Sequence, residues 1–283
     1  HRDRWAYQEV DDIPAFAPYT KMNAVVDDPA RLPDMLRQAF RVATTGSPGP
    51  VHLQFAGNTG QAIENAEIDF DGVIEAQYGQ VPPDRPQPDL NKVREAAKRI
   101  SEARRPVIVA GGGVKYSGAY EALNKLAEAM HVPVATSLNA KDAILDNNPL
   151  CVGVVGTYSR RSANQVVAEA DLVIFVGTRA GGMTTHFWTI PAKGTPTIQV
   201  DIDPLVNDRN YPTDVSIVGD ARVTLEKMNE LNVPVPKERV EWLKQVKEIC
   251  TSYKIDFKDL YESDAYPIRP ERIVNELSNG MPK

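Results

Sequence analysis

Three apolar segments of the sequence each end in residues that could contact a nucleotide. The endings are Gly111, Gly112 and Gly113 after residues 106–110, Arg179 after residues 172–176, and Asp201 and Asp203 after residues 197–200. Glycines let backbone amides approach a phosphate closely, arginine forms charge-assisted hydrogen bonds with it, and carboxylates accept hydrogen bonds from ribose hydroxyls. One glycine-rich turn would be weak evidence, but three endings of matching chemistry predict a nucleotide site.

The same three segments have the pattern of parallel β-strands. Each is a short apolar run bounded by glycine or a polar residue, and helical patterns alternate with the strands, which is typical of strands buried on both faces of a sheet. In open sheets of this kind, ligands bind beyond the carboxyl ends of the strands. We therefore predict an α/β fold with a doubly wound parallel sheet, a Rossmann-like central domain of six strand–helix units or fragments, over about residues 89–230.

The region before the central domain predicts a partial α/β domain. Residues 1–60 contain a predicted strand at 24–26, an amphipathic helix with an apolar stripe over 32–43, and a second strand at 51–55. Residues 61–88 are polar and become rich in proline, as expected for a linker.

The region after the central domain predicts the start of another unit. Residues 231–283 contain a linker helix around Trp242 and an amphipathic helix that begins at Pro270. The sequence has no methionine at position 1 and stops one turn past that last helix. Because a domain normally contains a complete sheet of its own, we expect both ends to be parts of larger domains.

Composition narrows the classes of function. Of the 283 residues, 42% are apolar and 25% are charged, so a buried core is expected. The net charge of −6 argues against nucleic-acid binding, and no apolar run approaches the ~20 residues of a membrane span. Cys151 and Cys250 fit a reducing compartment, and no Cys/His cluster has metal-ligand spacing. We expect a cytoplasmic protein with no metal ligands in this chain.

The order of motifs over nearly the whole chain resembles the thiamine-diphosphate-dependent enzymes of the acetolactate synthase group. Residues 7–9 (Tyr-Gln-Glu) and 20–23 (Thr-Lys-Met-Asn) are similar to the late part of their pyrimidine-binding domain, which closes with a turn like residues 46–51 (Gly-Ser-Pro-Gly-Pro-Val). Residues 105–220 resemble their central domain, and residues 268–270 (Ile-Arg-Pro) resemble the opening of their diphosphate-binding domain.

This resemblance implies an enzyme that makes or breaks a carbon–carbon bond next to the carbonyl of a 2-oxo acid. It implies thiamine diphosphate and Mg²⁺ as cofactors, a homodimer or homotetramer at full length, and Gln8 and Lys21 in the vicinity of the active site. The family's ylide-forming glutamate and its Gly-Asp-Gly…Asn motif have no counterpart in the sequence. The resemblance therefore implies that residues 1–283 alone are inactive.

The sequence departs from the synthase pattern where those enzymes contact FAD. Synthases that hold FAD have arginine where Ser47 stands, Gly-Met-His-Gly at the place of residues 156–159, and Phe-Asp-Asp-Arg at the place of residues 180–183. The glycine turn and the Asp-Ile-Asp strand end remain. We therefore expect an adenine nucleotide and not FAD, and a related 2-oxo acid decarboxylase or carboligase is an alternative to the synthase.

Simpler explanations exist for each predicted site residue. The three glycines could form only a tight turn, the two aspartates could cap the turn at Pro204, and Arg179 could be an ordinary solvated side chain. The central region could also be a stand-alone nucleotide-binding or regulatory module, although such a module would not need the two flanking regions.

Overall fold

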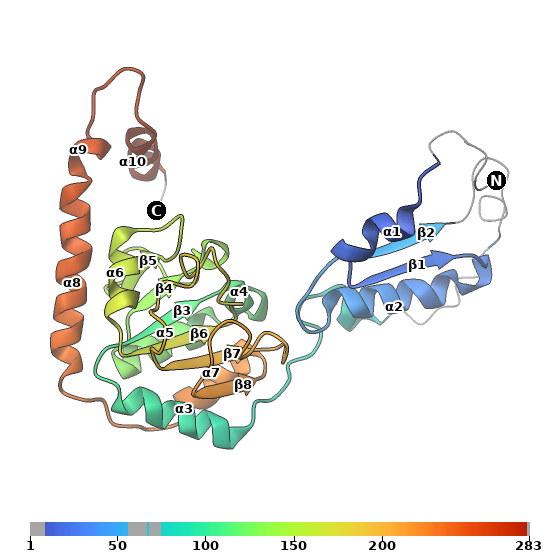
Figure 1. Ribbon diagram of the computed structural model, residues 1–283, viewed down its shortest axis with the longest axis horizontal. Helices are drawn as coiled ribbons and strands as arrows, with labels where there is room; N and C mark the ends of the chain where they lie inside the picture. The colour runs from blue at the N-terminus through green and yellow to red at the C-terminus, as the bar shows by residue number, and fades with distance from the viewer. Residues whose placement is uncertain (1–8, 56–66, 68–74, 282–283) are drawn as a thin grey trace. The chain divides into compact units, whose positions relative to one another are not determined.

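The computed structural model describes residues 9–55, 67 and 75–281 (Figure 1). The chain divides into two compact units, residues 1–85 and 86–283. The division falls within the segment that the sequence predicts as a linker, residues 61–88.

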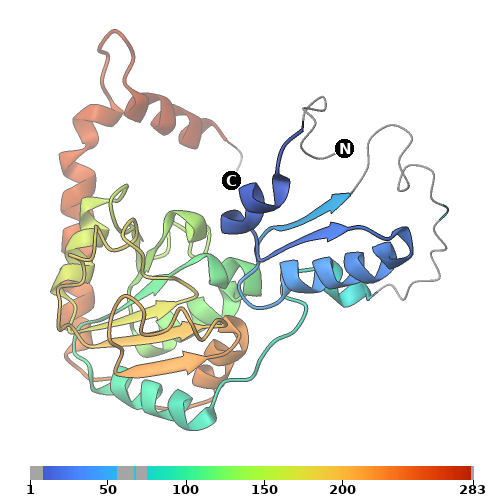
Figure 2. The same ribbon diagram turned by 45° about the vertical axis from the view of Figure 1, so that its right-hand side comes forward.

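The first unit contains the predicted strand–helix–strand arrangement. Strands β1 (Met22–Val26) and β2 (Val51–Phe55) pair in parallel, and α2 (Leu32–Thr44) connects them. Figure 2 shows α2 along one side of this strand pair and α1 (Asp12–Phe16) on the other. Met35 and Ala39, one helical turn apart, form the buried stripe of α2.

The second unit is built on a six-stranded sheet in the order β5-β4-β3-β6-β7-β8, in which every neighbouring pair is parallel. The strands are β3 (Pro106–Ala110), β4 (Val134–Thr136), β5 (Cys151–Val154), β6 (Leu172–Val176), β7 (Thr197–Asp201) and β8 (Val215–Val218). The predicted doubly wound α/β fold is therefore confirmed. The three strands chosen from the sequence, β3, β6 and β7, are direct neighbours.

Helices cover both faces of this sheet, and side chains alternate between the two cores. On β3, Ile108 and Ala110 pack in the core with α3, α5 and α7, whereas Val107 and Val109 pack in the core with α6 and α8. The helices are α3 (Leu90–Glu102), α4 (Gly112–Ser117), α5 (Tyr120–Met130), α6 (Arg161–Glu169), α7 (Ala221–Asn229) and α8 (Arg239–Asp256).

Three of the six predicted strand–helix units or fragments lack the helix. No α-helix follows β4, β6 or β7 before the next strand; the connections are irregular or contain only a short 3-10 turn. Residues 177–196 contain four glycines and two prolines, and residues 202–214 contain two prolines, which interrupt helical hydrogen bonding. The two longer connections can therefore carry functional residues on loops instead of helices.

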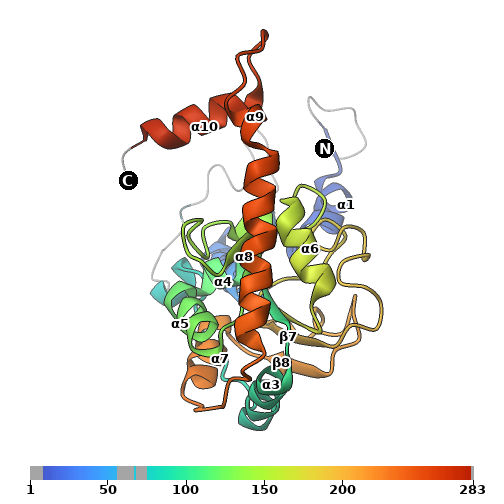
Figure 3. The same ribbon diagram turned by 90° about the vertical axis from the view of Figure 1, so that its left-hand side faces the viewer.

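Helix α8 is part of the central core and not only a connection to the C-terminal helices. Trp242 is 2% exposed, and its indole Nε1 donates to the carbonyl of Pro106 at 3.1 Å. Figure 3 shows α8 running beside α6, and an Arg161–Asp256 ion pair joins these two helices. After α8 come α9 (Lys258–Tyr261) and α10 (Pro270–Gly280), which contact each other.

The first turn of α8 carries a fully buried arginine that caps two other helices. The guanidinium of Arg239 donates to the carbonyls of Ile100 and Ala103 at the end of α3, and to that of Met130 at the end of α5. The carbonyls at a helix end lack internal donors and carry partial negative charge, so a cation is stabilised there. Burial lowers the pKa of Arg239 to about 10, which leaves the guanidinium charged at neutral pH.

We expect Arg239→Met to lower the free energy of unfolding by about 3 kcal/mol or more, because three buried helix-end carbonyls would lose a charged donor. Urea denaturation of both proteins measures this. The control is Lys237→Met on the same segment, an exposed side chain whose loss should cost less than about 0.5 kcal/mol. Equal midpoints for the two variants would contradict the capping role.

Candidate functional site

The strand order places the topological switch point of the sheet between β3 and β6. The chain builds the sheet outward from β3 through β4 to β5, then returns to the other side of β3 and continues through β6, β7 and β8. At such a switch point the loops that leave the two central strands diverge to opposite faces. The glycine turn follows β3 and the segment with Arg179 follows β6, so both predicted groups border this point.

The glycine turn contacts the end of β6 too closely for any side chain. A Cβ atom on Gly113 would lie 2.6 Å from the Cα of Gly177, and one on Gly111 would lie 2.3 Å from the Gly177 carbonyl oxygen. Gly177 itself has φ +59°, a backbone conformation that side chains disfavour. Packing between two strand ends therefore accounts for Gly111 and Gly113. The simpler explanation, a tight turn that needs a positive φ, does not account for them, because none of the three glycines has a positive φ.

Two of the three glycine amides are used inside the protein. Gly111 N donates to the carbonyl of Val176 at 2.8 Å, and Gly113 N donates to that of Gly177 at 2.9 Å. The expectation that all three amides face a phosphate needs this correction, because sheet-like bonding to β6 takes up two of them. Gly112 differs, since it is the first residue of α4, where a helix provides no internal acceptor.

The two aspartates after β7 are held in a compact turn. Asp201 Oδ1 accepts from the amide of Asp203 at 3.0 Å, and Asp203 Oδ1 accepts from that of Leu205 at 2.9 Å. The carboxyl group of Asp201 is mostly buried, and this burial raises its pKa. Capping thus occupies one oxygen of each carboxylate and fixes the directions in which both groups point.

Arg179 lies near enough to Asp201 for their charges to interact. The positive charge of Arg179 partly offsets the effect of burial on the pKa of Asp201. Arg179 is exposed, and its own carbonyl accepts from Asn210 Nδ2 at 2.8 Å, so the loop after β7 is attached to the loop after β6. An arginine and a carboxylate at adjacent strand ends are suited to the phosphate and the ribose of one nucleotide.

Gln199 was not predicted from the sequence, although its side chain joins the loops after β6 and β7. Its side chain is buried on β7, donates to the carbonyl of Thr178 at 3.1 Å and accepts from the amide of Asp208 at 3.2 Å. A glutamine within an otherwise apolar buried strand was the available signal, because a buried polar side chain normally has a structural task.

The loop that carries Arg179 continues into an unusual left-handed turn. His186, Phe187 and Trp188 have φ values of 47°, 55° and 60°, a conformation that costs roughly 1–2 kcal/mol per residue. Hydrogen bonds offset this cost: Phe187 N donates to the carbonyl of Gly182 at 2.6 Å, and Trp188 N donates to the hydroxyl of the buried Thr185 at 3.0 Å. These hydrogen bonds connect residues 182–188 within the turn.

Of the two residues expected near the active site of the full enzyme, the structure describes only Lys21. Gln8 lies outside the described residues. The ammonium group of Lys21 donates to the carbonyls of Thr45 at 2.7 Å and Ser47 at 2.9 Å, so it holds the turn before β2. Proximity of either residue to the active site remains a prediction.

The described part of the chain offers neither a metal-ligand cluster nor a helix suited to a bilayer. Within residues 9–55, 67 and 75–281, no three His, Cys, Asp or Glu side chains gather in a way that could hold a metal ion. None of the helices in this described part combines the length and apolar character that crossing a membrane requires.

The six parallel strands, the helices on both faces and the switch point between β3 and β6 define a Rossmann-like α/β domain. Residues 93–228 match the family described as thiamine pyrophosphate enzyme, central domain. The matched segment begins within α3 and ends within α7, so it covers the sheet and the strand ends described above.

Curated relatives extend the similarity to almost the whole chain. The probable acetolactate synthase large subunit of Methanocaldococcus jannaschii is 35% identical over 96% of this chain and 45% of its own length. The acetolactate synthase large subunit of Corynebacterium glutamicum is 31% identical over 98% of the chain and 43% of its own length. The glyoxylate carboligase of Escherichia coli O157:H7 is 30% identical over 95% and 45%. The chain spans less than half the length of these relatives.

The chain belongs to the thiamine-diphosphate-dependent enzymes of the acetolactate synthase-like family, and residues 93–228 are their central domain. The resemblance found in the sequence is therefore confirmed.

The contacts of the glycine turn predict different effects for two neighbouring substitutions. We expect Gly113→Ala to lower the free energy of unfolding by about 1–3 kcal/mol, because the new methyl group meets backbone atoms of Gly177. Gly112→Ala is the matched control, because its Cβ would make only ordinary contacts, 3.6 Å from Asn139, and should leave the free energy of unfolding nearly unchanged. Thermal unfolding of the two variants measures the difference, and equal losses would contradict the close packing of β3 and β6.

Proposed function

We propose that this chain is part of a thiamine-diphosphate-dependent enzyme that makes or breaks a carbon–carbon bond next to the carbonyl of a 2-oxo acid, in the manner of acetolactate synthase. The observation that carries the proposal is the extent of the similarity. Relatives named as synthases align through 96–98% of the chain, including both regions that flank the central domain. This extent favours an enzyme over a stand-alone nucleotide-binding module.

We further propose that the central strand ends bind an adenine nucleotide. In this arrangement Arg179 contacts a phosphate, the amide of Gly112 is a further donor, and Asp201 or Asp203 accepts from the ribose or the adenine. The support is the Asp201–Arg179 proximity and the attachment of Asn210 to the Arg179 carbonyl. FAD is disfavoured, because residues 156–159 and 180–183 lack the side chains that FAD-binding synthases have there.

The remaining cofactors belong to the proposal for the full enzyme. Thiamine diphosphate, bound with Mg²⁺, supplies the carbanion chemistry at the 2-oxo acid. The described residues of this chain contain no carboxylate cluster that fits its metal, so no reaction step is assigned to them. We place Gln8 and Lys21 near the active site, the enzyme in the cytoplasm, and its full-length form in a homodimer or homotetramer.

A carboligase is the second candidate, because one relative is named glyoxylate carboligase and aligns over 95% of the chain at 30% identity. A related 2-oxo acid decarboxylase differs from both only in what receives the carbanion. None of the contacts described for the central domain distinguishes these three reactions, so substrate choice must be measured.

The gene that encodes this chain, expressed between its natural start and stop codons, should yield a protein that consumes pyruvate or glyoxylate only when thiamine diphosphate and Mg²⁺ are added. Carbon dioxide release and analysis of the carboligation product identify the reaction. Purified residues 1–283 serve as the control and should show no turnover. A full-length protein that is inactive on both 2-oxo acids would contradict the proposed function. Turnover by residues 1–283 alone would contradict the prediction that the catalytic groups lie outside this chain.

A further inference from the structure

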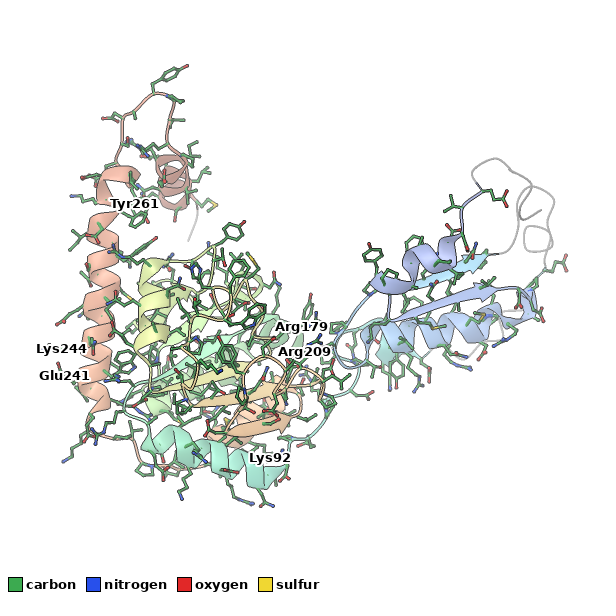
Figure 4. The ribbon with its side chains drawn as sticks, viewed as in Figure 1. Lys92, Arg179, Arg209, Glu241, Lys244 and Tyr261 are labelled. Atoms are coloured by element: carbon green, nitrogen blue, oxygen red, sulfur yellow. The ribbon has the colours of Figure 1, made fainter. Side chains whose placement is uncertain are left out.

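A second arginine lies beside the predicted nucleotide contacts on the loop between β7 and β8. Arg209 is exposed and directly precedes Asn210, whose Nδ2 donates to the carbonyl of Arg179 at 2.8 Å. This bond holds the backbones of the two arginine-bearing loops together. Figure 4 shows both arginine labels at the same side of the domain.

Within the part of the chain that the structure describes, no ion pair is formed by Arg179 or Arg209, whereas Arg160, Arg161 and Arg222 each pair with a carboxylate. Two positive charges on adjoining loops, with Asp201 near Arg179, favour the binding of an anion that carries more than one negative group. The arrangement is therefore suited to a ligand with two neighbouring phosphates.

The loop that carries Arg209 is anchored on both sides of it. On one side, Asp208 N donates to Gln199 at 3.2 Å and the Asp208 carboxylate accepts from Thr213 N at 2.9 Å. On the other side, Tyr211 packs against Phe175 with ring centroids 5.6 Å apart, and its hydroxyl donates to the carbonyl of Pro191 at 3.3 Å.

The Asp208 carboxylate accepts from Thr213 and is attracted by Lys92, and among the described residues it forms no ion pair with Arg209. These anchors fix the backbone at Arg209 in advance, which lowers the entropy cost of binding.

We propose that Arg209 and Arg179 together bind the diphosphate of a nucleoside diphosphate, with Arg179 on the phosphate next to the ribose and Arg209 on the terminal phosphate. This inference rests on the nucleotide site proposed above. It adds a residue outside the three strand ends, and it makes the site selective for a diphosphate over a monophosphate. Arg209 acts in binding and takes no part in bond making.

Calorimetry with ADP, AMP and inorganic pyrophosphate tests the proposal on residues 1–283, in the wild type, Arg179→Gln and Arg209→Gln. We expect Arg209→Gln to weaken the binding of ADP roughly ten- to thirtyfold, as for the loss of one charge-assisted contact. It should weaken the binding of AMP by less than about twofold. Arg179→Gln should weaken the binding of both nucleotides. Arg209→Lys should recover part of the ADP affinity. The matched control is Arg104→Gln, an exposed arginine at the amino end of β3, which should leave all affinities unchanged.

The possible results separate this proposal from the one it rests on. Unchanged ADP affinity in Arg209→Gln, or an equal loss for AMP, would overturn the role of Arg209 while leaving the nucleotide site in place. If the wild type binds neither nucleotide, the proposed nucleotide site is overturned. The titration with pyrophosphate then tests whether the two arginines bind a diphosphate. Pyrophosphate binding that Arg209→Gln abolishes would support the pair as a diphosphate site, and no pyrophosphate binding would overturn it. Because Arg209 is exposed, its variants should retain the thermal midpoint of the wild type.

Discussion

The close approach of two strand ends is the constraint on which the rest of the central domain depends. Gly113 and Gly177 lie so near each other that neither has room for a Cβ atom. This contact brings the ends of β3 and β6 together at the switch point of the sheet and thereby determines where Arg179 begins its loop. The same contact uses two amides of the glycine turn, so in the proposed nucleotide site most of the ligand contacts fall to the charged groups on β7 and its neighbouring loops.

Those charged groups are positioned by hydrogen bonds between loops and not by helices. Gln199 joins the loops after β6 and β7, Asn210 attaches one to the other, and the left-handed turn at residues 186–188 stiffens the longer of them. A loop replaces a helix at each of these places, so polar groups gather at one edge of the sheet. Arg239 stabilises the opposite part of the domain by capping α3 and α5. The edge that carries the site can therefore hold closely spaced charges while the domain remains folded.

The sequence predicts the sheet because its strands are short apolar runs between glycines, and a strand buried on both faces allows little else. It predicts that Arg179 and Asp201 lie at the same edge of the sheet, since the carboxyl ends of adjacent parallel strands share an edge. It does not predict that the amides of Gly111 and Gly113 donate to carbonyls at the end of β6, because a glycine turn has the same sequence whether its donors face a ligand or another strand. Arg209 could not be predicted either, since its place depends on a hydrogen bond from Asn210 to a residue 31 positions away. The core role of α8 was hidden for a similar reason: its buried arginine looks like a surface residue in the sequence.

The central claim is that the carboxyl ends of β3, β6 and β7 form one adenine-nucleotide site within a thiamine-diphosphate enzyme domain. Hydrogen–deuterium exchange of residues 1–283 with and without ADP tests it most directly. The account predicts slower exchange in peptides that cover residues 111–116, 177–182 and 201–211, with no change in those that cover residues 103–106 at the amino edge, and a weaker effect with FAD at the same concentration. Protection confined to other parts of the chain, or stronger protection by FAD, would contradict it.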